Sequence, residues 1–150
     1  MDSNQIERII WSYKEGRKYF KGCFPCDKIP QCSQYPVAYI INEDDSNKGG
    51  SHWVAIFIKD FETVYFFDSY ATLYSNMYIL NFLKNFKTVI INPYPFQSIL
   101  SNVCAQYCIF FVISMIRGML FSMFLRILYN QLDPDYYVKV FVNNFVNNTS

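Results

Sequence analysis

Four side chains of this sequence have the chemical types needed for acyl transfer through a cysteine. In chain order they are His52, Asp68, Gln97 and Cys104. In such chemistry a base takes the proton of the thiol, a carboxylate orients that base, and N–H donors stabilise the oxyanion on the attacked carbonyl. Each residue alone also has an ordinary structural explanation. The choice between a structural and a catalytic role therefore depends on their spacing and on the elements that carry them.

His52 is the only histidine in the chain and lies in the stretch GGSHWVAIFI. Asp68 ends the apolar run YFFD, where a carboxylate costs free energy unless it is paired or solvated. If residues 52–60 and 63–70 form a hairpin, Asp68 lies beside the start of the partner strand, which is His52. The carboxylate then accepts a hydrogen bond from one ring nitrogen and stabilises the imidazolium. The alternatives are that His52 has only a structural role at the start of its strand and that Asp68 is a turn residue at the end of its strand.

Cys104 follows Ser101 and Asn102, which are both good N-cap residues. A helix is therefore predicted to start near Val103, with the thiol in its first turn. There the positive end of the helix dipole favours the thiolate, and a nearby imidazolium lowers the pKa of the thiol further. The alternative for Cys104 is a small buried hydrophobic residue. Cys108, one turn later, is expected to point into the core and to be inert.

Gln97 lies seven residues before Cys104, in a predicted loop over residues 95–102. An amide there can donate a hydrogen bond to the oxyanion, and the backbone N–H of Cys104 supplies the second donor. Trp53, next to the base, points to the opposite face of its strand and is expected to be a packing residue.

The hydrophobic pattern predicts the elements that position these residues. Apolar, β-branched or aromatic runs predict strands over residues 37–42, 52–60, 63–70 and 87–94. A first helix is predicted to start at a cap within residues 2–4, and another is predicted over residues 73–86. Two further helices are predicted on either side of a join near Gly118, and a last one after Asp133, with Pro134 in its first position. Residues 21–36, with one Gly and three Pro, are predicted to be a loop. We expect one α+β domain, residues 1–150, with a mainly antiparallel sheet between helices.

The composition excludes several classes of protein. With 52% hydrophobic, 20% aromatic and 17% charged residues, the chain is too apolar to be disordered. A net charge of +1 gives no global field for nucleic acid or an anionic membrane, and the basic residues between 8 and 21 are interpreted as a solvated helix face. No signal peptide is apparent, and Arg117 and Arg126 interrupt the most membrane-like segment, 107–129. A soluble protein that is not secreted is expected.

The chain has five cysteines, an odd number that indicates free thiols in a reducing compartment. The stretch CFPC, residues 23–26, has half of a zinc-site spacing, and Cys32 offers a third ligand, but no second pair follows. A structural zinc is therefore a weak alternative, and no metal or cofactor is expected.

The order of these motifs resembles the adenovirus protease family (adenain) and the related small-modifier proteases. The matching stretches are GGSHW around His52, YFFDSYA around Asp68, and QSILSNVCAQYC from Gln97 through Cys104 to Cys108. The seven-residue step from Gln97 to Cys104 favours adenain, because small-modifier proteases have one residue fewer there. FKGCFPCDKIP and VAYIINEDDSNKGGSHW also resemble adenain in order and spacing, so the likeness runs over most of the chain. Compact adenain-like proteases of virus-like DNA transposons and small DNA viruses share its short length.

The resemblance implies a permuted papain-like fold in which the cysteine comes last. It implies that Cys104 is the nucleophile, His52 the base, Asp68 the residue that orients it, and Gln97 an oxyanion donor. The implied substrates are polypeptides, by analogy capsid-type precursors cleaved after small residues such as Gly-Gly. The resemblance further implies a monomer in the host nucleus or cytoplasm, or packaged in the virion, and leaves room for an activating peptide.

Some residues depart from the adenain pattern. Ala105 stands where the family usually has Gly, and Asp68 stands in place of a Glu. No cysteine lies between Cys32 and Cys104, so the disulfide partner of the family's activating peptide is missing, and the net charge of +1 gives no support for stimulation by DNA.

Other functions share these residues. A deconjugating protease for ubiquitin-like modifiers has the same site, and an inactive binding module could keep the fold. An acyltransferase with a permuted site is a third alternative, but no sequence signal for an acyl-CoA pocket is seen.

Overall fold

The computed structural model describes residues 1–44, 52–72 and 76–149. The helices are α1 (Ser3–Ile10), α2 (Lys14–Tyr19), η1 (Cys26–Lys28), α3 (Met77–Leu83), α4 (Cys104–Ile116), α5 (Phe121–Tyr129) and α6 (Pro134–Thr149). The strands are β1 (Phe20–Pro25), β2 (Val37–Asn42), β3 (Trp53–Ile58), β4 (Thr63–Phe67) and β5 (Thr88–Ile91). The predicted α+β class is confirmed.

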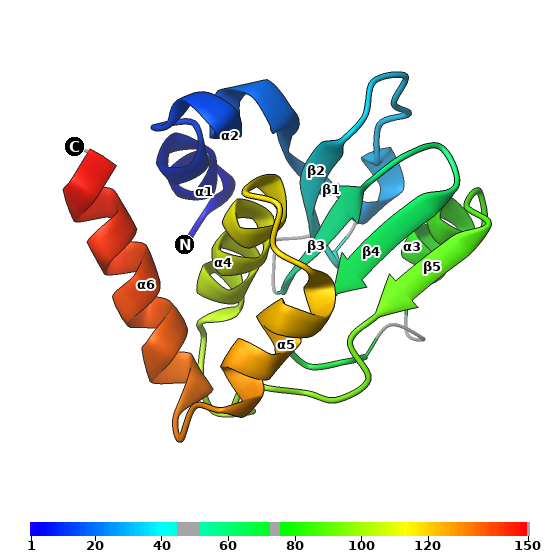
Figure 1. The fold of residues 1–150 in the computed structure, drawn as a ribbon. Helices are drawn as coiled ribbons and strands as arrows, with labels where there is room; N and C mark the ends of the chain where they lie inside the picture. The colour runs from blue at the N-terminus through cyan, green and yellow to red at the C-terminus, as the bar shows by residue number, and fades with distance from the viewer. Residues whose placement is uncertain (45–51, 73–75, 150) are drawn as a thin grey trace.

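The five strands form one sheet in the order β1-β2-β3-β4-β5 (Figure 1). The central pairs β2–β3 and β3–β4 are antiparallel, whereas the outer pairs β1–β2 and β4–β5 are parallel. The prediction of a mainly antiparallel sheet is therefore wrong, and the sheet is mixed. The connection from β4 to β5 crosses over through α3, and a crossover of this kind returns the chain in the same direction.

The predicted loop over residues 21–36 is also partly wrong, because β1 occupies its first residues. Gly22 has φ 129° and lies where the register of β1 with β2 shifts, which is a β-bulge. Pro25 ends the strand at an edge of the sheet, where a missing N–H is tolerated. Glycine and proline, which indicated a loop, are thus compatible with an edge strand.

A helix bundle covers one face of the sheet and α3 covers the other (Figure 1). The central helix α4 packs on β3, and nearly all of its residues are buried. An all-round apolar helix is stable only inside a core. This burial holds the first residue of α4, Cys104, at a fixed place beside the sheet.

The other predicted elements are confirmed in outline. The chain turns between α4 and α5 at Gly118, which has φ 86°, and α6 starts at Pro134. The predicted helix over 73–86 is observed as α3, and its residues 73–75 lie outside the described residues, as do 45–51 of the link before β3. In the described part of the chain, every helix is too short or too polar to span a membrane.

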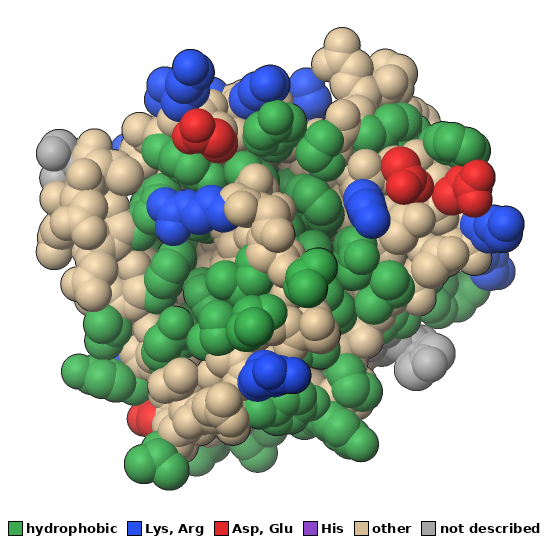
Figure 2. Space-filling model, viewed as in Figure 1, with side chains coloured by type: hydrophobic (Ala, Val, Ile, Leu, Met, Phe, Trp, Pro, Cys, Tyr) green, Lys and Arg blue, Asp and Glu red, His purple; other side chains and the backbone are tan. Residues whose placement is uncertain are grey.

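The basic residues near the N-terminus lie on the surface. All five are exposed: Arg8, Lys14, Arg17, Lys18 and Lys21. Figure 2 shows Lys and Arg side chains over the end of the molecule where Figure 1 places α2. This placement agrees with a solvated face.

Candidate active site

The β3–β4 hairpin brings His52 and Asp68 together. His52 immediately precedes β3, Asp68 immediately follows β4, and Ala55 pairs with Phe67 across the hairpin. The ring nitrogen Nε2 of His52 lies 2.7 Å from Oδ1 of Asp68, and both side chains are buried. The antiparallel register therefore turns two residues sixteen positions apart into an acid–imidazole pair.

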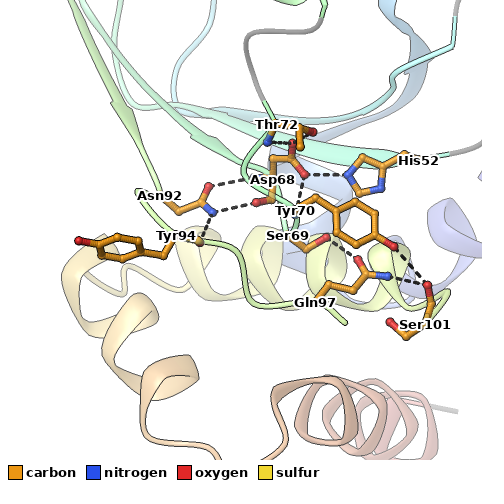
Figure 3. Close-up of polar contacts among 9 residues, drawn as sticks. All are labelled: His52, Asp68, Ser69, Tyr70, Thr72, Asn92, Tyr94, Gln97 and Ser101. Atoms are coloured by element: carbon orange, nitrogen blue, oxygen red, sulfur yellow. Dashed lines mark hydrogen bonds and ion pairs between the residues drawn. The ribbon is translucent and has the colours of Figure 1, made fainter. Parts of the chain in front are cut away.

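The carboxylate of Asp68 is surrounded by donors (Figure 3). Oδ1 also accepts the N–H of Tyr70 at 2.9 Å, while Oδ2 accepts the N–H and the hydroxyl of Thr72 at 2.8 and 2.9 Å. Burial alone would raise the pKa of Asp68, but the His52 ring, its charge and these N–H groups outweigh it and lower that pKa. Asp68 therefore stays ionised beside the ring.

Asn92, which the sequence motifs do not indicate, fixes the backbone of Asp68. Asn92 follows β5, and β5 runs parallel to β4, so the two strands end at the same edge of the sheet. Its Oδ1 accepts the N–H of Asp68 at 3.0 Å, and its Nδ2 donates to the carbonyl of Asp68 at 2.8 Å. A polar residue that ends a β-branched run immediately before Pro93 was the available signal for this contact.

The imidazole of His52 is held from three sides. The ring of Tyr70 stacks on it at 4.6 Å between centroids. Burial alone would lower the pKa of His52, but the hydrogen bond with Asp68, the contact with Cys104 and the charges of Asp68 and Glu43 raise it to about 9. At neutral pH the ring is therefore cationic.

Cys104 is the first residue of α4 and is half-buried beside this ring. Burial alone would raise the pKa of the thiol, but the His52 ring, its charge and the N–H groups of Trp53 and Ala105 lower it. Because Nε2 of His52 is engaged by Asp68, Nδ1 is the nitrogen left to face the sulfur. Nδ1 is buried and makes no other hydrogen bond among the described residues, and the interaction between ring and thiol lowers the pKa of Cys104.

The start of α4 differs from the prediction in one respect. Its N-cap residue is Val103, which makes no side-chain cap, and neither Ser101 nor Asn102 takes that position. The first N–H groups of a helix are orphan donors, and a helix start without a side-chain cap can offer them to a ligand. The N–H of Cys104 is therefore available as an oxyanion donor.

Gln97 is buried, and its side chain lies between Ser69 and Ser101 (Figure 3). Its Oε1 accepts a hydrogen bond from the hydroxyl of Ser69 at 2.6 Å, and its Nε2 donates to the carbonyl of Ser101 at 3.2 Å. A carbonyl can only accept, so Ser101 fixes which end of the amide is Nε2. Among the described residues the other hydrogen on Nε2 has no recorded acceptor, so it can bind an oxyanion.

A cleft of about 240 Å³ joins these groups. It is lined by Met1, His52, Trp53, Tyr70, Gln97, Ser101, Asn102, Cys104 and Ala105. Trp53 packs against the core and its indole N–H donates to the carbonyl of Met1 at 3.2 Å, which agrees with a packing role. Two larger hollows beside β1, of about 300 and 350 Å³, bring no imidazole to a thiol.

The remaining cysteines lie elsewhere. Cys108 is fully buried, and burial raises the pKa of its thiol well above the usual value. Cys23 packs against the core on the α4 side, whereas Cys26 and Cys32 belong to the core on the α3 side. The CFPC stretch therefore does not bring its two sulfurs together. Within the described ranges, the side chains grouped closely enough to hold a metal are Glu43, His52 and Asp68.

No protein-family model matches the chain, and none of the curated proteins searched matches it. A functional proposal therefore rests on the geometry of the site and on the motifs of the sequence.

Proposed function

We propose that this protein is a cysteine endopeptidase of adenain type. The observation that supports the proposal most strongly is the pairing of a thiol of lowered pKa, Cys104, with an imidazole whose pKa is raised to about 9, His52. These opposite shifts favour transfer of the thiol proton to the imidazole, which is how a cysteine nucleophile is activated.

The reaction uses each residue in turn. The Cys104 thiolate attacks the scissile carbonyl, and Gln97 Nε2 and the Cys104 N–H bind the resulting oxyanion. His52 then gives its proton to the leaving amine, and an acyl-enzyme remains on the sulfur. Water, deprotonated by His52, attacks the thioester and releases the second product. Asp68 keeps Nε2 occupied, so Nδ1 carries out both proton transfers.

The fold of the adenain family is proposed on the same basis. The four residues come from the start of a strand, the end of its hairpin partner, a loop, and the first turn of the buried helix α4, in that order along the chain. The permuted papain-like site runs in this order. Support comes from this order together with the motifs around His52, Asp68 and Cys104.

The substrate class follows from the family resemblance. We infer polypeptide substrates of the capsid-precursor kind, cleaved after small residues such as Gly-Gly, in the infected host cell or the virion. The structure contributes a cleft of about 240 Å³ that reaches Cys104 and could receive an extended peptide.

The test is peptide cleavage measured as a function of pH. Wild-type protein and Cys32→Ser, which removes a thiol away from the cleft, should cleave a fluorogenic Gly-Gly peptide with a bell-shaped pH profile. Cys104→Ala should be inactive. A fluorogenic ubiquitin-like modifier is the second substrate, and fast turnover of that substrate alone would favour a deconjugating protease. Failure of wild-type protein to cleave either substrate or to react with a thiol-directed electrophile at Cys104 would favour an inactive binding module.

A further inference from the structure

A third carboxyl group, that of Glu43, lies at the His52–Asp68 pair. Glu43 is the residue after β2, and β2 pairs antiparallel with β3 up to Asn42 and Trp53. The pairing continues one step further, because the N–H of Glu43 donates to the carbonyl of His52 at 2.9 Å. Glu43 is therefore placed directly opposite the proposed base.

The backbone of Glu43 is fixed on its other side as well. Its carbonyl accepts the thiol of Cys26 at 3.1 Å and the side-chain amide of Asn76 at 2.8 Å. Together with the bond to His52, these contacts come from three different elements of the chain. The fold thus fixes the backbone position from which the Glu43 side chain projects.

The carboxylate of Glu43 reaches the pair. An oxygen of Glu43, a ring nitrogen of His52 and an oxygen of Asp68 all lie within 4.8 Å of one another. An opposite charge at this distance favours the charged form of a group. The side chain of Glu43 is half-buried, so water screens the interaction only in part.

The charged and titratable groups around the ring come from three elements. Those facing His52 in the described residues are Glu43 after β2, Asp68 after β4 and Cys104 at the start of α4, with the Tyr70 ring stacked on the imidazole. The titratable groups facing Glu43 are His52, Asp68 and Asp44, which is the next residue along the chain.

We propose that Glu43 is a second positioning carboxylate of the active site, which shares the imidazolium of His52 with Asp68. Asp68 holds the ring through a hydrogen bond to Nε2, whereas Glu43 acts through its charge. Burial and the charge of Asp68 raise the pKa of Glu43, while His52 opposes this rise. The inference rests on the proposed function for its catalytic meaning, but the contact itself can be measured without cleavage.

The test uses the fact that His52 is the only histidine in the chain, so that its ring protons give an unambiguous NMR signal. The titration is made in Cys104→Ser protein, where no thiol at position 104 titrates and no substrate is cleaved. Glu43→Gln should lower the midpoint of His52 by about one pH unit. Asp44→Asn, which removes the neighbouring acid, should leave it unchanged, and Glu43→Asp should give a smaller decrease than Glu43→Gln.

The catalytic readout is the pH profile of kcat/KM with Cys104 intact. The alkaline limb, which reports loss of the imidazolium, should move to lower pH in Glu43→Gln by the same amount as the NMR midpoint. Coincident NMR titrations for the parent protein and both Glu43 variants would overturn the inference, whether or not the protein cleaves peptides. A shifted NMR midpoint in a protein without peptidase activity would instead overturn the proposed function and leave the ring–carboxylate contact standing.

Discussion

The side-chain amide of Asn92 binds both backbone groups of Asp68, accepting its N–H at 3.0 Å and donating to its carbonyl at 2.8 Å. Both residues are buried, and they lie at the ends of the neighbouring parallel strands β5 and β4. Asn92 thereby takes over the backbone pairing at the point where β4 has ended. The acid of the proposed catalytic site is thus held by a residue that touches neither His52 nor Cys104 in any recorded hydrogen bond.

Replacement of Asn92 should destabilise the protein. Asn92→Ala leaves the buried N–H and carbonyl of Asp68 without their partner, at a cost of about 2–4 kcal/mol in the free energy of unfolding. Urea unfolding followed by tryptophan fluorescence measures it. Asn143→Ala, at an exposed position of α6, is the matched control and should change stability by less than about 0.5 kcal/mol. Equal stabilities of the two variants would show that the contact contributes little.

Thiol labelling should distinguish Cys104 from the buried cysteines. At pH 6, iodoacetamide should modify Cys104 first, because the thiol of lowered pKa reacts as thiolate. Cys23 and Cys108, whose pKa values are raised by burial, should stay unmodified. Peptide mass spectrometry identifies the sites, and His52→Ala should slow the reaction at Cys104. Faster labelling of Cys23 or Cys108 would contradict the assignment.

Gln97 and Ser69 should act on the same catalytic step. Gln97→Ala removes the proposed oxyanion donor and should lower kcat by about 10²–10³ with KM little changed. Ser69→Ala leaves the amide in place but removes the hydroxyl that holds Oε1, and should lower kcat by about tenfold. Ser98→Ala is the control on the same loop, since its hydroxyl accepts the N–H of Leu100. A KM effect without a kcat effect would place Gln97 in substrate binding alone.

The imidazolium should stabilise the folded protein over a defined pH range. The folded pKa of His52 lies above its unfolded value of about 6.5, so this contribution is complete below that pH and is lost as the pH rises toward the folded pKa. In Cys104→Ser protein, where thiol titration at this position is absent, the loss should reach about 2 kcal/mol by pH 10 relative to the Cys104→Ser, His52→Gln double variant. Denaturant unfolding at several pH values measures it. Parallel pH curves for the two proteins would contradict a cationic ring.

The lowered pKa of Asp68 acts in the opposite direction. Its contribution is complete above the unfolded value of about 3.9 and is lost as the pH falls through the lower folded pKa. The two groups together therefore stabilise the folded chain most between about pH 4 and 6.5.

The parts of the site that depend on local pattern could be predicted from the sequence. The hairpin spacing predicted that His52 and Asp68 meet, and the helix signals before Cys104 predicted a thiol in a first turn. Both depend on residues that are neighbours along the chain or across a tight turn. The cap was misassigned, because the hydroxyl of Ser101 donates to the carbonyl of Ser98 and the carbonyl of Ser101 accepts from Gln97 and Tyr70.

The parts that depend on distant contacts could not be predicted. The role of Asn92 requires that β5 run parallel to β4, which no local pattern specifies. The hydroxyl of Ser69 matters only because a loop twenty-eight residues away places Gln97 beside it. The strand β1 was missed because its glycine and proline are acceptable only at a bulge and at a sheet edge, and the edge position is a property of the whole sheet.

The edge position of β5 has a further consequence. This strand has four residues, is half-exposed, and pairs with β4 alone at the edge of the sheet (Figure 1). Asn92, which follows it, nevertheless holds the backbone of Asp68. Short edge elements open at a lower free energy than buried ones, so we expect β5 to open before α4 and the central strands. Peptide cleavage should therefore be lost under mild heat or urea before spectroscopic melting begins. The reason is that the least stable strand of the sheet positions the carboxylate beside the imidazole.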